Sequence, residues 1–93
     1  SSVNQGAGFL VASLAEARRR GVPEARLVHV GHGAAAHEDE DFLQRDHYAA
    51  SPSLAVSIAR CLAMNGVRAE ALAHVELYSC FPCVPKLARR VLD

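Results

Sequence analysis

Apolar residues in this 93-residue chain gather in separate stretches whose lengths and spacings differ. Three short stretches, at residues 9–12, 26–31 and 75–78, are rich in residues that favour strands, and the first is apolar enough for a strand buried on both faces. Residues 52–65 instead repeat apolar side chains on one face at helical spacing. The pattern therefore predicts three strands and one well-marked helix.

Capping residues place two helices on the chain. Ser13 precedes a predicted helix over residues 14–20 that Gly21 ends, and Ser51 precedes a helix that begins at Pro52. That second helix ends at Asn65-Gly66, because glycine readily adopts the left-handed conformation found just past a helix. We expect its face of Leu54, Ile58, Cys61 and Leu62 to lie in the core.

The remaining stretches complete the order of elements. Residues 32–51, with an acidic run at 38–41 and no sustained period, predict a long surface loop with one helical turn near residues 42–43. Residues 68–73 predict a short turn, and prolines 82 and 85 lead into a last helix over residues 86–92. The order β-α-β-loop-α-β-α predicts one α/β domain with mostly parallel strands and right-handed crossovers.

Composition narrows the classes of partner and compartment. Lys plus Arg equals Asp plus Glu at ten each, so no net field draws the chain to nucleic acid or anionic lipid. Three cysteines, an odd number without a secretory signal, favour a reduced cytoplasmic setting. Because no apolar run approaches the roughly 20 residues that cross a bilayer, we expect no membrane span.

Two sets of residues are candidates for redox chemistry or metal binding. Cys80 and Cys83 form a Cys-x-x-Cys that brings two thiols close together, which makes the chain a candidate dithiol oxidoreductase. Only ten residues follow Cys83, whereas thioredoxin-like sites have further strands after them, so the context fits a dithiol oxidoreductase less well than the spacing does. The histidines form neither a His-Glu-x-x-His helix nor a paired zinc pattern, so solvated loop histidines are the better interpretation and we expect no metal.

Ordered local patterns resemble the thiolase family along nearly the whole chain. Residues 1–7 are similar to the thiolase Ser-Gly-x-Asn-Asp-Gly-Ala segment, and Ser51-Pro52 resembles the start of its proline-led helix. The sharpest likeness is at residues 78–81, where thiolases have Asn-Glu-Ala-Phe and sterol-carrier-type thiolases have His-Asp-Cys-Phe. Here the residues are Tyr78, Ser79, Cys80 and Phe81. This form is similar to bacterial thiolase-like acetyl-CoA acetyltransferases.

The resemblance implies Claisen-type acyl exchange between an enzyme cysteine and coenzyme A in lipid metabolism. Tyr78 would take the oxyanion-hole position, with Ser79, Cys80 and Phe81 as its motif neighbours, and Ser1 would lie against the coenzyme A pantetheine arm. The acyl-CoA thioester is then a substrate, and no cofactor is bound tightly. The family's nucleophile would lie upstream of residue 1.

The same resemblance makes the chain, residues 1–93, a fragment of a thiolase-like C-terminal domain. Its further catalytic motifs would lie downstream of residue 93, so the segment alone is expected to be inactive and its parent to be a homo-oligomer. Two alternatives stay open: the dithiol oxidoreductase centred on Cys80 and Cys83, and a thiolase-fold partner that has lost catalysis. Tyr78-Ser79 departs from both thiolase patterns, as the second alternative would require.

Overall fold

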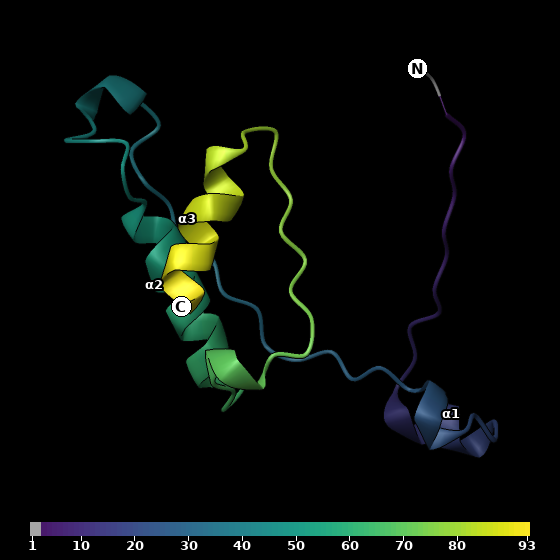
Figure 1. Cartoon of the computed structure of the whole chain (residues 1–93). Coiled ribbons are helices and arrows are strands. Elements are labelled where there is room, and N and C mark those ends of the chain that lie inside the picture. Colours follow the sequence, from purple (N-terminus) through teal and green to yellow (C-terminus); the bar gives the residue numbers. More distant parts are fainter. Residues whose placement is uncertain (1–2) are drawn as a thin grey trace. The chain divides into compact units, whose positions relative to one another are not determined.

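The computed structural model describes residues 3–93, and every regular element within them is helical. The chain divides into two compact units, Ser1–Val30 and Gly31–Asp93, each of which is described by itself (Figure 1). The predicted α/β fold with mostly parallel strands is wrong, because no strand forms in the described residues.

The first unit contains the helix α1, Leu14–Arg19, and the 3-10 turn η1, Glu24–Arg26. Ser13 caps α1 as predicted, since its Oγ accepts the N–H of Glu16 at 3.2 Å. Gly21 follows with φ +69°, and Val22 N–H returns to the carbonyl of Ala17 at 3.0 Å. These bonds form the glycine closure typical of helix C-termini, so both ends of α1 follow from the sequence.

The surface of α1 is held by exposed ion pairs. Glu16 accepts hydrogen bonds from Arg19 and Arg20, and Arg18 pairs with Glu24 at 2.6 Å. Hydrogen bonds from Arg19 and then Arg20 lower the pKa of the Glu16 carboxyl. The Glu16 carboxylate is therefore bonded to these two arginines. It does not accept the main-chain N–H of Ser13, as the acidic residue of a full capping box would.

The second unit is built on the helices α2, Pro52–Met64, and α3, Cys83–Leu92, which pack against each other (Figure 1). Two 3-10 turns accompany them, η2 at Phe42–Gln44 and η3 at Ala69–Ala71, both close to predicted turns. Ser51 caps α2 by accepting the N–H of Leu54, and Gly66 ends it at φ +61°. The helix predicted from residue 52 is thus confirmed at both ends.

The core between these helices is small. Ala88 of α3, 3% exposed, is the one fully buried hydrophobic residue among those described. The predicted α2 core face is half-buried; it comprises Leu54, Ile58, Cys61 and Leu62. With one small buried side chain, little apolar area is withdrawn from water between these helices.

The three stretches predicted as strands stay without partners. Leu10 is fully exposed, Val28 and Val30 are each more than nine-tenths exposed, and Val75 is 48% exposed. An extended, apolar sequence favours a strand only where a neighbour supplies the ladder of hydrogen bonds, and isolated pairs are marginal in water. The strand predictions are therefore wrong, because the pairing that defines a sheet is absent from the described residues.

The Asn65 side chain makes two main-chain hydrogen bonds of the kind that a neighbouring strand would make. Its Oδ1 accepts the N–H of His32 at 2.8 Å, and its Nδ2 donates to the carbonyl of His32 at 2.9 Å. A second bond from Nδ2 to the carbonyl of Cys61, at 2.7 Å, fixes the amide on the end of α2. The side chain therefore satisfies both main-chain groups of one residue in an extended segment.

No helix among residues 3–93 combines the length and apolarity needed to cross a bilayer.

The hydrogen bonds of Asn65 with His32 and Cys61 are called the Asn65 clamp here. They require glycine at residue 31, because a Cβ there would overlap Oδ1 of Asn65. Gly31→Ala is expected to lower the free energy of unfolding of the α2–α3 unit by about 1–3 kcal/mol, because the clamp must move away. Chemical denaturation followed by helical circular dichroism measures the change. Gly33→Ala is the matched control, since nothing lies within 4 Å of its Cβ. Equal losses in the two variants would contradict the role of the clamp.

Candidate functional site

The four predicted site residues lie on an exposed stretch between η3 and α3. The Tyr78 ring is 85% exposed, and its hydroxyl lies 4.0 Å from the Cys80 thiol. Ser79 Oγ accepts the N–H of Phe81 at 3.1 Å, which turns the chain toward α3. The residues are neighbours along the chain, but neither hollow described below is lined by them.

An oxyanion donor must be held where charge develops, and Tyr78 is held only loosely here. Its one contact is the long approach to Cys80, and Ser79 is occupied with Phe81 N–H rather than orienting the phenol. An exposed phenol can donate one hydrogen bond. A complete oxyanion site would need a further element over Tyr78 to fix its direction and exclude water.

The cysteines do not meet in one site. Cys61 is half-buried and its thiol donates to the carbonyl of His32 at 3.4 Å. Cys80 and Cys83 are exposed free thiols, and Cys83 is the first residue of α3. The predicted contact of Ser1 with coenzyme A lies outside the described residues.

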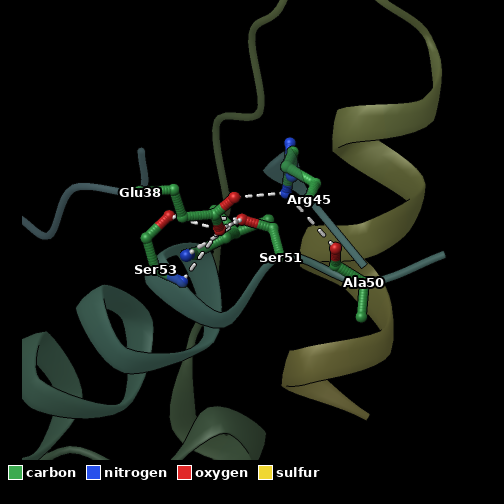
Figure 2. A network of polar contacts seen from close by, with 6 residues as sticks. Glu38, Arg45, Ala50, Ser51 and Ser53 are labelled. Carbon is green, nitrogen blue, oxygen red and sulfur yellow. Dashed lines mark hydrogen bonds and ion pairs between the residues drawn. The ribbon is translucent and has the colours of Figure 1, made fainter. Parts of the chain in front are cut away.

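A dense network of polar contacts surrounds Glu38, in the loop before α2 (Figure 2). Its Oε1 accepts from Ser51 Oγ at 2.5 Å, from Ser53 Oγ at 2.8 Å and from Ser53 N–H at 3.0 Å. Its Oε2 pairs with Arg45, which also donates to the carbonyl of Ala50 at 3.5 Å. Glu38, Arg45, Ser51 and Ser53, the Glu38 latch, thereby tie the loop to the first turn of α2.

The latch keeps Glu38 ionised. The hydroxyls of Ser51 and Ser53, the Ser53 N–H and the nearby Arg45 charge lower its pKa to about 2. A carboxylate with so low a pKa is a weak proton acceptor at neutral pH, so it is poorly suited to general-base catalysis. Its negative charge at the N-terminus of α2 is also favourable to the helix dipole. Glu38 is therefore a structural residue.

An open groove of about 360 Å³ runs beside the latch, between α2 and α3. Its walls are mainly apolar, including Leu54, Val84 and Leu87, and its rim carries Arg45 and the Cys83 thiol. Arg45 is engaged with Glu38 and lies 5.8 Å from the centre of the Tyr48 ring. The groove is therefore lined by apolar side chains and one thiol, and its cationic side chain, Arg45, is already paired with Glu38.

The loop histidines are dispersed rather than gathered. Among residues 3–93, no group of three or more His, Cys, Asp or Glu side chains is arranged to hold a metal ion. His37 and His47 line a second open hollow of about 480 Å³ together with Asp39 and Asp46.

No protein-family model, curated protein or solved structure matches this chain.

Sequence reasoning missed the two polar features that organise the second unit. The acidic run at 38–41 predicts part of a surface loop, whereas one of its carboxylates bonds to Ser51 and Ser53 at the start of α2, 13 and 15 residues away. Two serines flanking Pro52 at a helix start were the available signal, since they leave spare donors for an acid. Asn65 was read as a helix end, and nothing in the sequence marked His32 as its partner.

The Glu38 latch should weaken in acid. Because the pKa of Glu38 in the folded chain lies below its ordinary value, its contribution is complete above about pH 4.5 and is lost as the pH falls toward about 2. The protection factor of Ser53 N–H, which is its intrinsic exchange rate divided by its measured rate, should fall as the pH is lowered through this window. The Glu38 side-chain carbon shift should titrate with a midpoint near 2.

Glu38→Gln should give fast Ser53 exchange already at neutral pH, because the neutral amide weakens the bonds that the two serines and Arg45 make. Asp39→Asn changes the neighbouring carboxylate in the same way and is the control, with slow exchange retained. A Ser53 amide indifferent to both pH and Glu38→Gln would show that the latch does not hold the loop.

Proposed function

We propose that this chain is a segment of a thiolase-like acyltransferase that exchanges acyl groups between a protein cysteine and coenzyme A. The observation that carries the proposal is the ordered set of sequence patterns ending at residues 78–81, with Tyr78 where the thiolase pattern has its oxyanion-hole residue. The exposure of the phenol supports it, because a group that serves a reaction must be reachable. The substrate class is acyl-CoA thioester.

Tyr78 contributes one chemical step in this proposal. Its O–H donates a hydrogen bond to the thioester oxygen as negative charge gathers there, which lowers the barrier to the tetrahedral or enolate species. Phe81 and Cys80 flank the site without a direct role in proton transfer. The nucleophilic cysteine and its proton-transfer partners are contributed by residues outside 1–93, so the 93 residues alone do not turn over.

The small core is consistent with a segment that works inside a larger assembly. Ala88 is the one fully buried hydrophobic residue described, and Phe9, Leu10, Val28, Val30 and Tyr78 each expose more than four-fifths of their surface. Apolar exposure on this scale usually marks surfaces that another polypeptide covers.

A second candidate, dithiol redox chemistry, has the two exposed thiols of Cys80 and Cys83 in its favour. A redox titration separates it from acyl transfer. Reversible formation of a Cys80–Cys83 disulfide near cytosolic glutathione potentials, without coenzyme A exchange in the longer protein, would favour the dithiol function.

Acyl exchange from acetyl-CoA to labelled coenzyme A, measured for a longer protein containing this chain, tests the main proposal. Tyr78→Phe should lower kcat about 100-fold, since loss of an oxyanion donor typically costs that much or more. Tyr48→Phe is the matched control, because it removes a phenol hydroxyl elsewhere and keeps the ring beside Arg45. Unchanged kcat in Tyr78→Phe would favour a thiolase-like partner without catalysis, and turnover by residues 1–93 alone would refute the placement of the nucleophile.

A further inference from the structure

Residues 73–77, between η3 and α3, form an exposed segment whose main-chain groups are unpaired. Within the described chain these five residues take part in no hydrogen bond or ion pair, up to the contacts of Tyr78 and Ser79. Figure 1 shows the segment as an elongated stretch without helix or strand. Unpaired N–H and C=O groups in a row are a template for addition of another strand.

The side chains of this segment alternate in character. Ala73, Val75 and Leu77 are apolar, and His74 and Glu76 between them are exposed and polar. When the segment pairs as a strand, successive side chains point to opposite faces, so Ala73, Val75 and Leu77 share an apolar face and His74 and Glu76 share a polar face. The order of residues is also nearly symmetric about Val75.

We propose that two copies of the chain associate by antiparallel pairing of residues 73–77 about a two-fold axis at Val75. In this register Val75 faces Val75 of the second copy, and Ala73 faces Leu77 on the same apolar face. On the other face His74 lies opposite Glu76, and the symmetry makes that pair twice. The interface is isologous, so one segment supplies both surfaces.

Hydrogen-bond complementarity selects both the second copy and the register. Centring the axis one residue later sets Glu76 against Glu76, and like charges directly opposite each other are destabilising. Centring it one residue earlier sets His74 against His74 and leaves Glu76 without its partner. Only the axis at Val75 gives each carboxylate an imidazole donor while keeping the apolar residues on one face.

Sedimentation velocity of the 93-residue chain over a concentration series tests the pairing. The unmodified chain should show a monomer–dimer equilibrium. His74→Glu should raise the dimer dissociation constant about tenfold or more, because it sets two carboxylates opposite each other in both pairs. Adding Glu76→Lys to His74→Glu should restore the original dissociation constant, since a hydrogen-bond donor again lies opposite the carboxylate in both pairs.

His29→Glu is the matched control, because His29 also lies in an exposed run, between Val28 and Val30. It should leave the dissociation constant unchanged. A chain that stays monomeric throughout the series, a double variant that fails to restore the dimer, or an equal effect of His29→Glu would each overturn the proposal. The measurement uses no coenzyme A, so its outcome is independent of acyl transfer.

Discussion

The packing of α2 against α3 is the constraint on which the second unit depends. Ala88, which is 3% exposed, is the one buried hydrophobic residue among those described, so the hydrophobic contribution to stability is small. Polar side chains therefore fix much of the structure of this unit. The Glu38 latch fixes the loop to the start of α2, and the Asn65 clamp fixes residue 32 to its end. Both act at the ends of one helix, where main-chain groups lack partners.

Helices were predictable because their signals are local. Ser13 and Ser51 cap as their positions indicated, and Gly21 and Gly66 adopt the positive φ that ends each helix. These residues act within a few positions of themselves, so the sequence window contains the whole interaction. The last helix begins earlier than expected, at Cys83, since Pro85 is tolerated within a first turn.

Strands and the site were less predictable because they depend on partners far along the chain. The runs at 9–12, 26–31 and 75–78 carry β-prone residues, but no periodicity reveals whether a neighbour exists to pair with them. Similarly, the resemblance to thiolases at Tyr78 rests on the order of side chains in the sequence. Among the described residues, no acidic side chain orients the Tyr78 phenol and no other element covers it. The Glu38 latch was missed for the opposite reason, since an acidic run usually signals solvated loop.

The ion pairs on α1 give the two units different sensitivities to ionic strength. Glu16 and Glu24 hold their arginines on the exposed surface, where added salt weakens the attraction between opposite charges. The Asn65 clamp is built from neutral dipoles and the Ala88 contact from apolar atoms, neither of which added ions screen. Rising salt therefore weakens the ion pairs of α1, whereas in the second unit it acts on the Arg45–Glu38 pair and not on the Asn65 clamp or the buried Ala88.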